Sequence, residues 1–122
     1  MRIAVAVILF GVGLIHLLPV VGVTGTKSLD KLYGTQISDA NLLILMRHRA
    51  VLFGLIGALL MVAAFVPDIQ LAAIAAGLIS LLSFILIAQS TRNYNAKIRQ
   101  VVRIDIIALI LLAIALGLKL FA

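Results

Sequence analysis

Few side chains in this sequence are suited to chemistry, and those few lie beside long apolar segments. Arg47, His48 and Arg49 directly precede one such segment, and His16 lies near the end of another. Asp105 is an acidic residue set just inside a third. A charged side chain inside a membrane needs a partner, because its desolvation in lipid is costly. These residues therefore predict either a structural ion pair or a polar pocket for an anionic or hydrogen-bonding ligand.

The polar residues do not form a known catalytic or metal-binding motif. The sequence has no HExxH motif, no paired glutamates and no evident nucleophile–base set. It contains no cysteine, which excludes disulfides, thiolate metal sites and iron–sulfur clusters. We therefore expect no catalytic residue and no metal site, and the sequence favours a non-enzymatic role.

Four long apolar segments determine the class of protein. Hydrophobic residues make up 65% of the 122 residues and charged residues 11%, whereas soluble domains contain about 25% charged residues. An apolar helix of ~20 residues crosses a ~30 Å hydrocarbon core and satisfies its own backbone hydrogen bonds. The sequence therefore predicts an all-α fold, an antiparallel four-helix transmembrane bundle. The segments without Asp, Glu, Lys or Arg are residues 3–18, 50–66, 69–91 and 106–118.

The predicted helices occupy most of the chain, which we expect to form a single integral membrane domain over residues 1–122. The only sizeable loop is expected at about residues 19–38. The short connection PDIQ predicts that the second and third helices form a tight antiparallel hairpin. The expected helices cover about residues 2–18, 39–66, 69–91 and 96–121.

Sequence patterns also predict where helices begin and end in and after the loop. The pattern SLDKLYG is typical of a short helix or turn, with Ser28 as its N-cap and Gly34 at its end. Ser38 or Asp39 is expected to cap the second long helix, because short polar side chains accept hydrogen bonds from free N–H groups there.

Positive charge is distributed unevenly between the two ends of the predicted bundle. Arg2 and Lys119 lie at the end that carries both termini. Because cytoplasmic loops of membrane proteins are enriched in Lys and Arg, we expect both large connections in the cytoplasm and both termini outside, in a bacterial inner membrane. This arrangement explains the net charge of +6 without a nucleic-acid partner. Eight of the ten basic residues lie at the loop end: Lys27, Lys31, Arg47, Arg49, Arg92, Lys97, Arg99 and Arg103.

The three basic residues at positions 47–49 are expected to face different surroundings. At 100° per residue, Arg47 shares a helical stripe with small residues of the kind that line helix contacts in membranes. Arg47 is therefore expected to point into the bundle, while His48 and Arg49 anchor lipid headgroups. The small residues of the stripe are Ala50, Gly54 and Ala58.

The predicted polar layer lies at the cytoplasmic end of the bundle. Asp105 is expected to balance the charge of Arg47, with Arg103 as a second candidate for this pairing. His16 and Tyr94 would offer hydrogen bonds at the same membrane level. The predicted ligand-binding residues are thus Arg47, His16, Asp105, Tyr94 and Arg103.

Several short motifs resemble a known family. The first apolar helix ends in GLIHLLPVVG, the loop contains LYG, and DANLLILMRHRAVLFGLIGALL and later RIDIIALI follow. Over most of its length, the sequence resembles the DoxX-like group of small bacterial four-helix membrane proteins. This resemblance implies an inner-membrane bundle in which MRHR and LYG act together, and some DoxX relatives are associated with quinone-using oxidoreductase systems. Similar sequences are sometimes named phosphopantetheine adenylyltransferase, a soluble α/β enzyme, but no parallel-sheet pattern is present here to support that name.

Three functions remain open from the sequence. The leading one is a protein that binds a lipid-like ligand or a protein partner through the polar layer, with no cofactor. An alternative is a membrane oxidoreductase subunit that uses quinone or haem, with His16 and His48 as the available axial imidazoles. The third is a small transporter, which the one-sided charge and the absence of a membrane-embedded glutamate disfavour. Membrane lipids, a second copy of the chain or another membrane protein are the expected partners.

Overall fold

The computed structural model describes residues 1–20, 25–34 and 39–121, which form helices and no β-strand. The all-α prediction is therefore confirmed for this part of the chain. The ends of the four long helices lie within three residues of the expected positions. The elements are α1 (Arg2–Leu17), α2 (Thr26–Tyr33), α3 (Ala40–Ala63), the 3-10 turn η2 (Pro67–Ile69), α4 (Gln70–Thr91) and α5 (Ala96–Phe121).

Four of these helices, α1, α3, α4 and α5, are each long and apolar enough to cross a membrane. At 1.5 Å per residue, the 24 residues of α3 extend over roughly 36 Å. Large apolar side chains on the outer surface remain uncovered, such as Ile3, Ile79 and Ile107. Exposure of this kind is unfavourable in water and favourable in lipid. The four apolar helices indicate a membrane protein.

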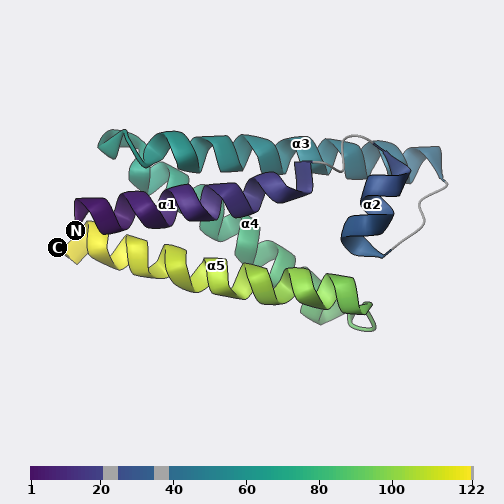
Figure 1. Cartoon of the computed structure of the whole chain (residues 1–122). Coiled ribbons are helices and arrows are strands. Elements are labelled where there is room, and N and C mark those ends of the chain that lie inside the picture. Colours follow the sequence, from purple (N-terminus) through teal and green to yellow (C-terminus); the bar gives the residue numbers. More distant parts are fainter. Residues whose placement is uncertain (21–24, 35–38, 122) are drawn as a thin grey trace.

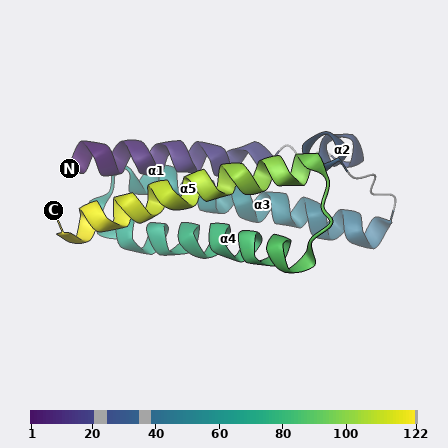
Figure 2. The same ribbon diagram turned by 90° about the horizontal axis from the view of Figure 1, so that it is seen from below.

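The long helices run side by side as a four-helix bundle (Figures 1 and 2). Each contacts two neighbours, in the order α1, α3, α4, α5 around the bundle. Both termini lie at one end, and α2 lies at the opposite end. The centre is filled by apolar side chains from every long helix, among them Leu9, Leu60, Ile74, Leu81 and Leu112.

Helices α1 and α3 approach each other closely at two glycines. A Cβ atom added to Gly57 would lie 2.8 Å from the carbonyl oxygen of Gly13, and one added to Gly13 would lie 2.8 Å from the carbonyl oxygen of Gly57. Small residues allow such contacts between membrane helices. The contact places His16, which lies one turn after Gly13, directly against α3.

The first and last turns of α3 agree with the expected connections. The Asp39 side chain accepts a hydrogen bond from the backbone N–H of Asn41 at 3.0 Å and caps the helix. Ser38, the other predicted cap, lies outside the described residues. At its other end, α3 leads through the turn Pro67–Ile69 directly into α4, so the predicted hairpin is present.

The short helix α2 begins earlier than the sequence pattern predicts. Its N-cap is Gly25 rather than Ser28, which lies inside the helix, so the predicted cap was wrong. Gly25 has a φ angle of 129°, which glycine adopts more readily than other residues. The helix therefore begins directly after Gly25, before Ser28. Gly34 ends the helix in the left-handed conformation, as expected, with φ 68°.

Candidate functional site

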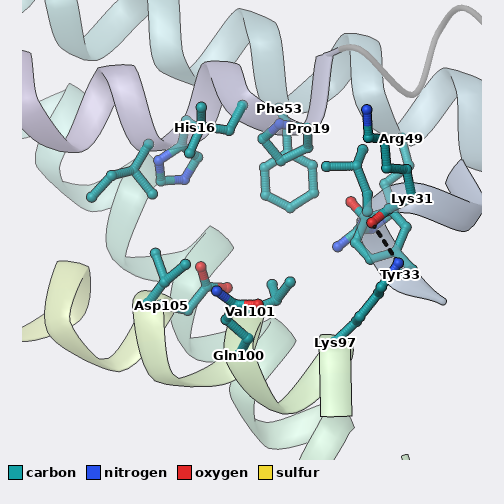
Figure 3. Close-up of a pocket in the computed structure, with 14 residues that line it drawn as sticks. His16, Pro19, Lys31, Tyr33, Arg49, Phe53, Lys97, Gln100, Val101 and Asp105 are labelled. Carbon is teal, nitrogen blue, oxygen red and sulfur yellow. Dashed lines mark hydrogen bonds between the residues drawn. The ribbon is translucent and has the colours of Figure 1, made fainter. Parts of the chain in front are cut away.

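A cavity of about 250 Å³ lies at the α2 end of the bundle, between α1, α2, α3 and α5 (Figure 3). Sites for small molecules commonly combine apolar walls with a few polar groups in this way. The polar lining residues are His16, Lys31, Tyr33, Arg49, Lys97, Gln100 and Asp105. The apolar ones are Ile15, Leu18, Pro19, Leu32, Phe53, Val101 and Ile104.

Arg49 provides positive charge on the α3 wall of this cavity. Its Nη1 donates a hydrogen bond to the hydroxyl of Tyr33 at 2.6 Å. Its guanidinium carbon lies 4.4 Å from the ring centre of Phe53 and 5.2 Å from that of Phe84. Aromatic faces stabilise a guanidinium without occupying its N–H donors. Arg49 makes no second hydrogen bond within the described ranges, so donors are left for a ligand.

Asp105 provides an acceptor on the α5 wall. It is 7% exposed, and its carboxylate accepts no hydrogen bond from any residue that the structure describes. Neither oxygen is completely enclosed, since each buried side-chain atom of the described part has a partner, and the side chain lines the cavity (Figure 3). Arg49 acts on it through its charge. Because a buried carboxylate without hydrogen bonds is costly, a ligand donor at this position would stabilise it.

His16 forms the inner part of the cavity wall. Its ring is 2% exposed and lies 5.7 Å from the ring of Phe53, centre to centre. Nδ1 lies 3.1 Å from the carbonyl oxygen of Val12, and Nε2 lies 3.3 Å from the hydroxyl of Ser80. A neutral ring with the proton on Nδ1 satisfies both contacts, donating to Val12 and accepting from Ser80.

The structure does not bring the two histidines into one site. His48 is exposed on α3 and does not line the cavity, whereas His16 is buried with both ring nitrogens in hydrogen bonds. The arrangement therefore does not fit a haem held between these two imidazoles.

Residues at the start of α5 hold α2 over the cavity. The Asn95 amide donates to the carbonyl oxygens of Tyr33 at 2.7 Å and Gly34 at 3.2 Å. Its own side-chain oxygen accepts from the backbone N–H of Ile98 at 2.8 Å, so Asn95 also caps α5. Lys97 donates to the carbonyl oxygen of Lys31 at 3.1 Å (Figure 3). The position of Tyr33, and through it that of Arg49, depends on these contacts.

The predicted orientation of the two arginines of α3 was wrong. Arg47 is exposed and does not line the cavity, whereas Arg49 lines it and is half-buried. Arg49 shares its stripe with Phe53 and Gly57, at intervals of four residues. Gly57 is buried against α1, and this contact sets the rotation of α3. Arg49, and not Arg47, is therefore the arginine that shares a cavity with Asp105.

The other predicted ligand-binding residues divide into two groups. His16 and Asp105 line the cavity together. Tyr94 instead accepts a hydrogen bond from Gln89 at 3.3 Å near the end of α4, and Arg103 is exposed on α5. Neither of these two lines the cavity.

The predicted site residues did not include Tyr33, Phe53 or Asn95, although the family resemblance linked LYG, which contains Tyr33, with MRHR. Two signals were present: the motif LYG, which contributes Tyr33, and an asparagine at the expected start of the last helix. Tyr33 of LYG and Arg49 of MRHR are directly hydrogen-bonded, so the two motifs meet in the structure.

Comparisons with known proteins do not identify a family for this chain. The chain matches no protein-family model, no curated protein and no solved structure. The resemblance to DoxX-like proteins stays a prediction from its short motifs.

Proposed function

We propose that this protein binds a lipid-like ligand whose polar part enters the cavity between α1, α2, α3 and α5. One observation carries the proposal. Asp105 is buried, lines the cavity and has no hydrogen-bond partner among the described residues. A buried carboxylate of this kind is costly to the free protein and is stabilised when a ligand donates to it. Arg49 supports the proposal, because its free donors line the same cavity.

The role we propose is binding and not catalysis. Arg49 and Asp105 recognise the polar part of the ligand from opposite helices, and Tyr33 positions Arg49. The apolar lining, such as Leu18, Phe53 and Ile104, suits the beginning of a hydrocarbon chain. His48 is exposed on α3, where it remains a candidate headgroup anchor.

We also propose that the chain lies in a bacterial inner membrane, as its resemblance to the DoxX-like group implies, and that the cavity opens toward the cytoplasmic side. Lys31, Arg49 and Lys97 line the cavity, and both termini lie at the opposite end of the bundle (Figures 1 and 2). By the positive-inside rule, this distribution of charge supports a cytoplasmic position for the cavity and an outside position for the termini.

Single cysteines test this orientation, because the natural chain has none. Asp68→Cys, in the exposed turn at the termini end, should react with an impermeant maleimide in intact spheroplasts. Ala96→Cys, exposed at the start of α5, should react only after the membrane is opened. The cysteine-free parent is the control for background labelling. Labelling in the reverse order would contradict the proposed orientation.

Asp105→Asn tests the binding role itself. The variant should retain much less ligand through purification, because an amide lacks the charge that holds a cationic or hydrogen-donating group. Once lipid has been removed, the same variant should be as stable as the natural protein or more stable, by about 1 kcal/mol, because the buried charge is gone. Lipid content and thermal unfolding in mild detergent measure the two effects.

The control for Asp105→Asn is Asp68→Asn, which makes the same chemical change at an exposed position. It should alter neither ligand content nor stability. If Asp105 has a purely structural role, Asp105→Asn gives the opposite result. The variant would then purify with as much lipid as the natural protein, and after delipidation it would be less stable. That result would contradict the proposal.

A further inference from the structure

A second cavity, of about 450 Å³, forms a groove between α3 and α4. We call it the α3–α4 groove. Both helices are long and apolar enough to cross a membrane, and Ile79 in the groove is 69% exposed. Its lining is mainly apolar and includes Leu52, Ile56, Ala76 and Ile79. A groove of this composition, on helices long and apolar enough to cross a membrane, suits lipid chains.

The groove and the polar cavity share one wall. Arg49 and Phe53 line both of them. The Arg49 guanidinium also lies 5.2 Å from the ring of Phe84, which lines the groove. On the inner side, His16 of the cavity contacts the hydroxyl of Ser80 of the groove at 3.3 Å. The polar cavity and the apolar groove are therefore adjacent, and the side chains of Arg49 and Phe53 border both.

Arg49 and Asp105, two of the charged residues that line the polar cavity, define the headgroup that fits between them. Arg49 offers N–H donors suited to a phosphate, for which a planar guanidinium is well matched. Asp105 offers an acceptor without a partner in the described part of the chain, suited to an ammonium group. The two residues lie on different helices and face the same space (Figure 3). A ligand that satisfies both carries a phosphate and a primary amine.

We propose that the cavity and the α3–α4 groove form one site for an aminophospholipid with a phosphoethanolamine headgroup. The phosphate lies toward Arg49, the ammonium lies toward Asp105, and an acyl chain passes Phe53 into the groove. This inference rests on the proposed function and adds to it the class of ligand and the position of its chain.

The headgroup is tested by competition. Delipidated protein is offered equimolar phosphatidylethanolamine, phosphatidylglycerol and phosphatidylcholine in mild detergent, and native mass spectrometry counts the lipid retained. The amount of phosphatidylethanolamine retained should exceed that of each other lipid by about tenfold. This ratio corresponds to the contribution of one charged hydrogen bond. Asp105→Asn should abolish its preference over phosphatidylglycerol.

The outcomes of the competition separate the two proposals. Equal retention of the three lipids, or a preference for phosphatidylglycerol or phosphatidylcholine, would overturn the aminophospholipid inference and leave lipid binding in place. Retention of no lipid at all would overturn the proposed function together with the inference.

The position of the acyl chain is tested by filling the α3–α4 groove. Ala76→Leu adds bulk inside the groove, whereas Ala75→Leu makes the same change at an exposed position of α4 outside it. Ala76→Leu should lower phosphatidylethanolamine retention about fivefold, because lipid chains and helices associate by close packing. Ser83→Leu, at an exposed position of the groove, should act in the same direction and serves if Ala76→Leu does not fold. If the variants filled in the groove retain as much phosphatidylethanolamine as Ala75→Leu, the placement of the acyl chain in the groove is overturned.

Discussion

Replacing Gly57 with alanine is expected to destabilise the bundle by about 1–3 kcal/mol, the usual cost of overpacking a close contact. The added Cβ would lie 2.8 Å from the carbonyl oxygen of Gly13 and 3.1 Å from the Cβ of His16. A backbone carbonyl cannot move aside as a flexible side chain can, so α1 and α3 must separate. Thermal unfolding followed by circular dichroism in mild detergent measures the loss.

A matched glycine makes this prediction specific to the helix contact. An added Cβ at Gly11, on α1, would meet nothing within 4 Å. Gly11→Ala should therefore leave the midpoint temperature of thermal unfolding unchanged or raise it slightly, since alanine favours the helix more than glycine does. If Gly57→Ala unfolds at the same temperature as Gly11→Ala, the helices do not approach as closely as the structure shows.

Replacing Arg49 with alanine is expected to lower lipid affinity by about tenfold to 100-fold, because hydrogen bonds from charged donors contribute about 1.5–3 kcal/mol each. The variant also removes the partner of the Tyr33 hydroxyl, which Arg49 contacts at 2.6 Å. We therefore expect faster hydrogen exchange in α2 as well. Lipid titration by native mass spectrometry and hydrogen exchange measure the two effects.

Two further variants separate the roles of Arg49. Arg49→Lys keeps the charge but loses the planar group that lies against the rings of Phe53 and Phe84, so an intermediate affinity is expected. Arg99→Ala removes an exposed charge from α5, outside the cavity lining, and should bind lipid as the natural protein does. Unchanged lipid binding in Arg49→Ala would remove Arg49 from the site.

The general architecture could be predicted from the sequence because lipid imposes strong constraints. Long segments without charge have to become helices, and a connection as short as PDIQ has to join antiparallel neighbours. The N-cap Asp39 and the left-handed Gly34 are local features, determined by a few neighbouring residues. Such features can be predicted without knowing which helices pack together.

The rotation of α3 could not be predicted in the same way. Its apolar side chains surround the helix, and small residues occur on more than one face, so no single stripe identifies the buried side. The buried side is selected by Gly57, which meets Gly13 of another helix. Arg49 lies on this side and Arg47 does not, which is why the predicted pairing of Arg47 with Asp105 was wrong.

The outer part of the site depends on contacts between distant segments. Asn95 holds the end of α2 through Tyr33 and Gly34, more than sixty residues earlier in the chain. The Tyr33 hydroxyl in turn accepts a hydrogen bond from Arg49, which lines the cavity from α3. Each residue type has an ordinary local explanation in the sequence, and only the packing of the helices reveals that they share one site.

The most direct test of the central claim is native mass spectrometry of the unmodified protein, extracted in mild detergent, with the bound molecules released and identified. The cavity that joins Arg49 and Asp105 predicts one lipid per chain, of a single headgroup class. Bare protein, or a mixture that reflects the composition of the surrounding membrane, would contradict a specific lipid site.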